Sequence, residues 1–243
     1  MTFPIITVAV TAVIAGFVQG TAGFAQGILL MLVLPGIFGV LKAGALSQFA
    51  SFFICVTLAV IYRRHISRKL CIRVWILYFP LFFLIHHLGK DADASILRPI
   101  LGIVLIVISL FGIFFAHKIK IRPTWKTILT CTALTAALDV FFGIGGPPMV
   151  ILMLASTKSH EEYLGTLQAT FACCNLGATL IRISTGQFPT ELFSAMGVLM
   201  PALIAGILLA RPAVRHITKE KSIPFVYATI GFAGLATFLK CVL

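Results

Sequence analysis

The stretch LDVFFGIGGPPMVILML, residues 138–154, interrupts a strongly apolar chain with residues that a continuous helix does not accommodate. It contains one acidic residue, Asp139, then three glycines in four positions, Gly143, Gly145 and Gly146, and after them two consecutive prolines. Glycine allows the backbone to turn, and proline suits the first turn of a helix, where no amide hydrogen is needed. The sequence therefore predicts that one helix ends here and that a second helix begins at once.

The composition is typical of a polytopic membrane protein. Hydrophobic residues make up 60% of the 243 residues and charged residues 11%, which leaves too little polar surface for a soluble domain of this length. Apolar runs recur along the chain, many of them long enough to cross a hydrocarbon core of ~30 Å as helices, and they do not alternate as barrel strands do. We expect an all-α membrane protein with eight to ten membrane segments. The runs cover residues 4–21, 24–41, 44–62, 70–88, 96–116, 127–142, 146–156, 163–183, 190–210 and 223–241.

The net charge of +12 comes from basic clusters between the apolar runs, at residues 62–69, 117–126 and 211–221. Lys and Arg in short loops mark the cytoplasmic side, where they face anionic lipid, so we expect membrane lipid and not nucleic acid as the partner of these clusters. With ten segments, all three clusters fall on one side, and the acidic loop 89–95 falls on the other. The sequence thus predicts cytoplasmic basic loops.

Motifs for catalysis, metal binding and nucleotide binding are missing from the sequence. The six cysteines include no CxxC pair and are expected to pack as small apolar residues, so no metal site is predicted. The chain has no HExxH, GxSxG or GxxxxGK[ST] motif, which disfavours an intramembrane enzyme and ATP consumption. We predict no cofactor and no enzymatic activity.

An internal repeat emerges when the chain is shifted against itself by 120 residues. The matched pairs are Gly23 with Gly143, Gln48 with Gln168, and Gln19 with Asp139. Five segments per half is an odd number, so two similar halves would be inserted in opposite orientations, as in many secondary transporters. We expect a first membrane repeat over residues 1–122 and a second over 123–243, together forming one membrane domain.

The run 146–156 is too short to span the bilayer, so it is expected to form a re-entrant or discontinuous pair with 127–142. Irregular backbone at membrane depth survives only where protein buries it or where it lines a water-filled cavity. The second helix would then direct its partially positive N-terminus into the protein, and GTAGFAQG, residues 20–27, would do the same from the opposite face. Together they would form an anion site. The alternative is that the glycines only let helices pack closely.

The candidate substrate-binding residues lie at the two breaks and on the helices that follow them. They are Gly23, Phe24, Ala25, Gln26, Gln48, Ser51, Gly143, Gly145, Gly146, Gln168 and Asn175. An uncharged amide such as that of Gln48 or Gln168 can hydrogen-bond an oxyanion without neutralising it. The alternative for these two residues is an interhelical hydrogen bond that holds the bundle together, worth ~0.6 kcal/mol.

Two charged residues lie inside or near the end of apolar runs and are candidates for coupling or gating. Asp139 could carry a coupling proton, could cap the broken helix or could reach the outer interface. Arg182 could attract or gate an anion, or could snorkel to lipid headgroups. Trp75 and Tyr78 are expected as anchors at the membrane interface.

The segments GFVQGTAGFAQGILLMLVLP (16–35) and GIGGPPMVILML (143–154) resemble the paired glycine-rich signatures of the sulfite exporter TauE/SafE family of membrane permeases. The resemblance covers nearly the whole chain. Gln26 and Pro147 stand where the family pattern has glycine. The resemblance implies transport of sulfite, of organosulfonates such as sulfoacetate, or of other small anions across the bacterial inner membrane.

We therefore expect a secondary transporter of small oxyanions that works by alternating access, with protons as a candidate coupling ion. An anion channel that uses the same half-helix N-terminal site is the alternative. Small-residue surfaces on several segments are compatible with a homo-oligomer.

Overall fold

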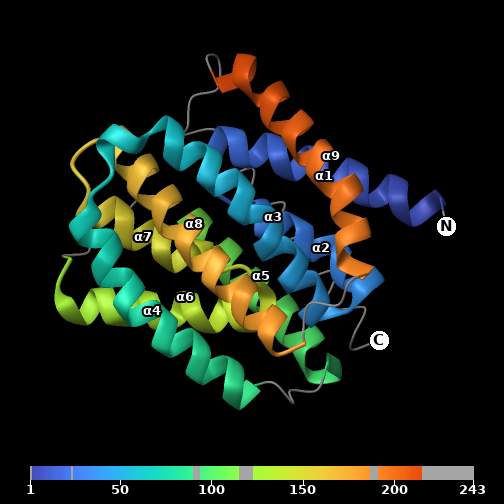
Figure 1. Cartoon of the computed structure of the whole chain (residues 1–243), viewed down its shortest axis with the longest axis horizontal. Coiled ribbons are helices and arrows are strands. Elements are labelled where there is room, and N and C mark those ends of the chain that lie inside the picture. The colour runs from blue at the N-terminus through green and yellow to red at the C-terminus, as the bar shows by residue number, and fades with distance from the viewer. Residues whose placement is uncertain (1, 23, 90–93, 115–122, 187–190, 215–243) are drawn as a thin grey trace. The chain divides into compact units, whose positions relative to one another are not determined.

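The computed structural model describes residues 2–22, 24–89, 94–114, 123–186 and 191–214 of the chain. Throughout these ranges the regular structure is helical, which confirms the all-α prediction (Figure 1). The elements are α1 (Thr2–Ala22), α2 (Gln26–Phe38), α3 (Val40–Ile61), the 3₁₀ helix η1 (Arg63–His65), α4 (Arg68–Gly89), α5 (Ala94–Phe114), α6 (Trp125–Phe142), α7 (Gly146–Ser156), α8 (His160–Ser184) and α9 (Glu191–Val214). The predicted segment 223–241 lies outside the described residues.

Among the described residues, five helices are long and apolar enough to cross a membrane. They are Val40–Ile61, Arg68–Gly89, Trp125–Phe142, Glu161–Ser184 and Phe193–Ala210. On α4, Tyr78 and Phe82 are fully buried, whereas Ile76, Phe83 and Leu84 are each more than half exposed. Large apolar side chains that face outward along such a helix are suited to lipid and not to water. The protein is an integral membrane protein.

The sequence predicts separate segments over residues 24–41 and 44–62, and the structure places the boundary between them three residues earlier, after Phe38. The helix α2 ends at Phe38 because Gly39 adopts a φ of 80°, in the left-handed region, and its N–H bonds to the carbonyl of Pro35. The helix α3 begins directly afterwards at Val40. The apolar composition continues across this boundary, so hydrophobicity alone did not locate it.

The chain forms two compact units, and each takes segments from both halves of the sequence. The first unit comprises Met1–Ala43, Ala92–Ile119 and Thr190–Leu243, and the second comprises Gly44–Asp91 and Lys120–Pro189. The first unit therefore contains α1, α2, α5 and α9, and the second contains most of α3 together with η1, α4, α6, α7 and α8.

In the first unit, α1 and α9 pack against each other through glycines. A Cβ atom added at Gly16 would lie 2.2 Å from the carbonyl oxygen of Leu203, and one added at Gly206 would lie 2.1 Å from that of Val13. Neither position has room for a side chain. These glycines therefore serve close helix packing.

In the second unit, α4, α6 and α8 enclose an apolar core. The buried members of this core are Tyr78, Phe82, Ala136, Val140, Cys174 and Ala178. The end of α6 packs on the start of the α3 portion, where a Cβ atom at Gly143 would lie 2.6 Å from the carbonyl oxygen of Gly44. The broken segment is thus held on a helical core.

The helix boundaries recur at a spacing of 120 residues. The helix α6 ends at Phe142, 120 residues after the end of α1, and α7 begins at Gly146, 120 residues after the start of α2. The start of α8 at His160 follows that of α3 by the same interval. This is the shift at which the matched pairs of the sequence align.

Candidate functional site

The first break lies in the first unit, between α1 and α2. Ala25 has a φ of 85° and is the one non-glycine residue with a positive φ among the described residues. Gln19, on the last turns of α1, reaches across the break, where its Oε1 atom accepts a hydrogen bond of 3.3 Å from the N–H of Gln26. Phe24 and Ala25 are both buried, and Gly23 lies outside the described residues.

The side chain of Gln26 is buried at the start of α2 without a hydrogen-bond partner. It is 1% exposed, and neither its Nε2 nor its Oε1 atom forms a hydrogen bond. A buried polar group without a partner costs about 1–3 kcal/mol. The first turn of α2 holds no acidic residue, and the N–H groups of Gly27 and Ile28 have no acceptor within their own helix. The first break therefore presents unused donors and no negative charge.

The second break lies in the second unit, between α6 and α7. The helix α6 ends at Gly143, whose φ of 65° lies in the left-handed region and whose N–H bonds to the carbonyl of Asp139. The helix α7 carries Pro147 and Pro148 in its first turn, as the sequence predicts.

The carboxylate of Asp139 caps the start of α7. Its Oδ1 atom accepts a hydrogen bond of 2.8 Å from the N–H of Gly145, and its Oδ2 atom accepts one of 2.9 Å from the hydroxyl of Tyr78. The side chain is 4% exposed. The capping interpretation of Asp139 is confirmed, and its placement at the outer interface is wrong.

Gly145 has to be glycine for this cap to form. A Cβ atom there would lie 2.6 Å from both Cγ and Oδ2 of Asp139 and 2.7 Å from Cγ2 of Thr135. At Gly146, by contrast, a Cβ atom would meet nothing within 4 Å. A side chain therefore fits at Gly146 but not at Gly145.

Arg182, on α8, is fully buried, so the snorkelling interpretation is wrong. Its Nη2 atom donates to the carbonyl of Asp139 at 2.9 Å and to that of Val140, while its Nε donates to Oε1 of Gln48 at 2.9 Å. The guanidinium thus satisfies carbonyls at the C-terminal end of α6, where a positive charge is favourable. Its Nη1 atom has no hydrogen-bond partner.

Gln48 links the same groups. Its Nε2 donates to the carbonyl of Asp139 at 3.1 Å, and its Oε1 accepts from Arg182. Both polar atoms of Gln48 therefore serve contacts between helices, which is the alternative that the sequence left open. Gln168 and Asn175 are buried on α8, and Ser51 is half-buried on α3.

Tyr78 is the site residue that sequence reasoning missed. It was expected as an interface anchor, which is wrong, because it is fully buried and donates to Asp139. Trp75 is partly buried and donates to the carbonyl of Thr170 at 3.4 Å. The helical spacing of Cys71, Val74, Tyr78 and Phe82 on one buried face of α4 is the signal that could have placed Tyr78 inside.

The family model for the sulfite exporter TauE/SafE matches residues 8–237. The chain belongs to the TauE/SafE family. It is accordingly a membrane transporter and not an enzyme. No curated protein and no solved structure matches the chain.

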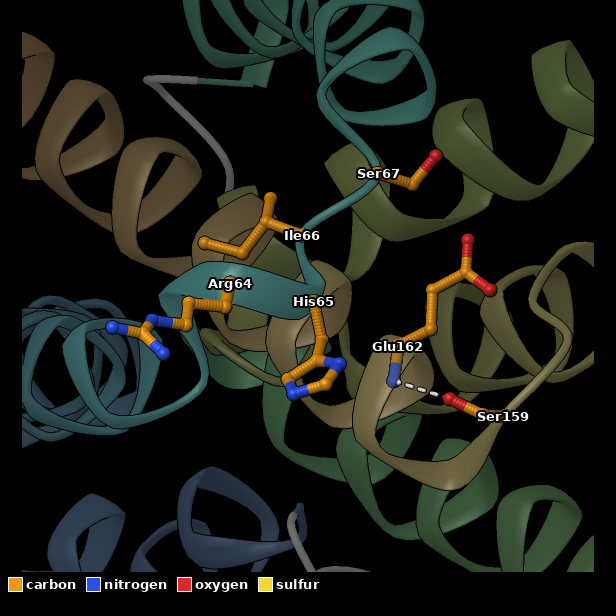
Figure 2. Close-up of a pocket in the computed structure, with 6 residues that line it drawn as sticks. All are labelled: Arg64, His65, Ile66, Ser67, Ser159 and Glu162. Atoms are coloured by element: carbon orange, nitrogen blue, oxygen red, sulfur yellow. Dashed lines mark hydrogen bonds between the residues drawn. The ribbon is translucent and has the colours of Figure 1, made fainter.

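A pocket of the second unit of this TauE/SafE transporter lies away from the break. It has a volume of about 310 Å³, and Figure 2 shows Arg64, His65 and Ser67 on the connection after α3 opposite Ser159 and Glu162 at the start of α8. The N–H of Glu162 donates to Oγ of Ser159, and the Arg64 side chain extends away from these two residues. No buried polar side chain without a partner lines this pocket, so it is a weaker candidate than the breaks.

A metal centre is not formed by the described part of this TauE/SafE transporter. No three His, Cys, Asp or Glu side chains among those residues are grouped so that they could hold a metal ion. The cysteines described as free are Cys55, Cys71, Cys131, Cys173 and Cys174, and they are buried or partly buried.

Proposed function

We propose that this transporter moves small oxyanions, namely sulfite or an organosulfonate such as sulfoacetate, across the bacterial cytoplasmic membrane by alternating access. The substrate class follows from the TauE/SafE family. The observation that carries the proposal is the fully buried guanidinium of Arg182, whose hydrogen bonds go to an amide and two carbonyls and whose Nη1 atom has no partner. A buried positive charge with a spare donor favours an anion.

Each of the two breaks supplies binding groups of its own in this proposal. At the first, the unpartnered amide of Gln26 and the first N–H groups of α2 are available to an oxyanion. At the second, the start of α7 has N–H groups at Gly146 and at Gly145, the latter bonded to Asp139 in this structure. Gln168 and Asn175 are proposed as further polar contacts.

Alternating access requires one set of elements to move against another, and we propose that two repeats, over residues 1–122 and 123–243, each contribute helices to these sets. The recurrence of three helix boundaries at a spacing of 120 residues supports the repeat. The contacts within each unit support it as well: α1 packs on α9 in the first unit, and their counterparts at this spacing, α6 and α4, pack together in the second. Halves with odd numbers of segments would have opposite orientations.

The orientation and the energy source belong to the same proposal. The basic clusters at 62–69, 117–126 and 211–221 are assigned to the cytoplasm. The substrate gradient, or protons carried by Asp139, would drive transport, since the sequence holds no nucleotide-binding motif.

The test is counterflow of labelled sulfite in proteoliposomes that contain the purified full chain. Sulfoacetate, thiosulfate, sulfate, lactate and chloride serve as competitors. Saturable exchange that sulfonates compete supports a carrier, whereas ohmic single-channel currents would establish the channel alternative. Absence of flux with all of these anions contradicts the proposal.

Two variants locate the site in the same assay. Gln26→Leu removes the unpartnered amide at nearly constant volume and is expected to lower the apparent affinity for sulfite about tenfold. Thr11→Val, in α1 of the same unit, removes a hydroxyl that already bonds to the carbonyl of Thr7, and it is expected to leave exchange unchanged. Equal exchange in both variants would remove Gln26 from the site.

A further inference from the structure

The carboxylate of Asp139 is held as a bound oxyanion would be. One oxygen accepts from the N–H of Gly145 at the start of α7, the other accepts from the hydroxyl of Tyr78, and the side chain is almost completely buried. Sulfite and sulfonate groups also present two oxygens to neighbouring donors. The donors that the second break would offer to a substrate are therefore occupied by a group of the protein itself.

Other donors beside this break have no acceptor. Pro147 and Pro148 carry no N–H and the N–H of Gly145 already bonds to Asp139, so in the first turn of α7 only Gly146 adds a further N–H group. The Nη1 atom of Arg182 is buried without a partner, although its Nη2 atom bonds to carbonyls of the same break.

Thr135 adds a second buried donor. Its hydroxyl is fully buried and has no partner, and its methyl carbon lies against Gly145, 2.7 Å from the position that a Cβ atom would take there. The break thus retains donor capacity for one more anion, while the negative charge of Asp139 opposes its entry.

We propose that Asp139 is an internal competitor of the transported oxyanion. When Asp139 accepts a proton, the oxyanion takes over the hydrogen bonds from Gly145 and Tyr78. The proton comes from the aqueous side from which the anion enters, and Asp139 releases it on the other side when it returns to its two donors. One proton then accompanies each anion. This inference rests on the proposed function and adds how the second break exchanges its ligand.

Asp139 is the proton carrier in this proposal, although other titratable groups lie near it. Tyr78 on α4, Cys55 on α3, and Cys174 and Arg182 on α8 are the titratable groups near it, and α7 contributes none. Among these groups, the carboxyl of Asp139 is the one that accepts hydrogen bonds from Gly145 and Tyr78, and we therefore assign the proton to it.

The first experiment uses the unmodified protein. Purified full-length protein in detergent, in weakly buffered solution with a pH indicator, is titrated with sulfoacetate, whose charge is constant between about pH 6 and about pH 8.5. We expect uptake of about one proton for each anion bound. Binding without proton uptake overturns the inference and leaves the proposed function standing. If the protein neither binds nor exchanges sulfite or sulfoacetate, both are overturned.

The second experiment compares variants in sulfoacetate counterflow across the same pH range. Asp139→Asn keeps the size of the side chain and an oxygen acceptor for Gly145 but removes the charge. We expect exchange without proton movement and an affinity independent of pH, whereas the affinity of the wild type weakens about tenfold for each pH unit, as uptake of one proton per anion requires. Glu161→Gln removes an exposed carboxylate from the same unit and is expected to behave like the wild type.

An Asp139→Asn variant that keeps the pH dependence of the wild type overturns the inference. If this variant does not fold, as judged by size-exclusion chromatography, the proton count of the wild type decides the question alone.

Discussion

The two breaks in this protein occupy matching positions in the sequence, yet the structure caps them with different chemistry. In the first, neutral Gln19 accepts the N–H of Gln26. In the second, Asp139, 120 residues later, accepts the N–H of Gly145. Each side chain reaches across its break to satisfy a backbone donor at the start of a short helix. The architecture is shared, and only one of the breaks carries a negative charge.

The two breaks also differ in the hydrogen-bond donors at the start of the helix that follows each of them. The start of α2 has an unpartnered Gln26 side chain and, after the capped N–H of Gln26, N–H groups at Gly27 and Ile28 that no acceptor within the helix uses, whereas two prolines remove donors from the start of α7. Arg182 holds carbonyls at the end of α6 in the second break. In the two proposals made above, the first break therefore accepts an anion directly, whereas the second exchanges one for its own carboxylate.

Loss of Arg182 should have the largest effect on the second break. In Arg182→Gln, the carbonyls of Asp139 and Val140 and the amide of Gln48 lose a charged donor, so we expect destabilisation of about 3 kcal/mol and nearly complete loss of sulfite exchange. Thermal unfolding in detergent and counterflow measure the two effects. Arg73→Gln, at an exposed position of α4, should change neither, and equal loss in both variants would refute a specific role for Arg182.

Gly145→Ala tests the carboxylate cap with the next residue as its matched control. The added Cβ atom would overlap with Asp139 and displace its carboxylate, so we expect destabilisation of about 2 kcal/mol and altered proton coupling. Gly146→Ala has open space around its Cβ atom and should be nearly neutral. Similar unfolding temperatures for the two variants would show that the cap contributes little.

Gln19→Glu makes the first break resemble the second. A carboxylate at this position would face the start of α2 and compete with the substrate there, so we expect the affinity for sulfoacetate to fall about fivefold above neutral pH and to recover in acid. The pH profile of counterflow measures this effect. A profile identical to that of the wild type would place anion binding away from the first break.

Ala25→Gly addresses the smallest difference, the backbone strain of the first break. Ala25 has a φ of 85°, which favours glycine, whereas the second break already uses Gly143 for its left-handed residue. We expect the variant to gain about 1 kcal/mol in stability, as measured by thermal unfolding, with exchange preserved. Loss of exchange without loss of stability would show that the strained conformation is needed for transport.

The sequence by itself determined the helical membrane class, the position of the break after Phe142, and the prolines at the start of α7. These features follow from local rules, because apolar run length, glycine and proline act within a few residues of their own position. The same rules placed the boundary between the runs 24–41 and 44–62 three residues too late, because the left-handed conformation of Gly39 ends α2 at Phe38.

Only the tertiary structure decided what surrounds Asp139. Tyr78 lies 61 residues away in the sequence and Arg182 lies 43 residues away, and Arg182 meets Gln48 across 134 residues. The apolar spans that carry these side chains tell which segments enter the membrane, but the choice of hydrogen-bond partner depends on which faces of α3, α4, α6 and α8 pack together. A polar group that is buried inside the protein needs a hydrogen-bond partner, and only the helices packed beside it can supply one.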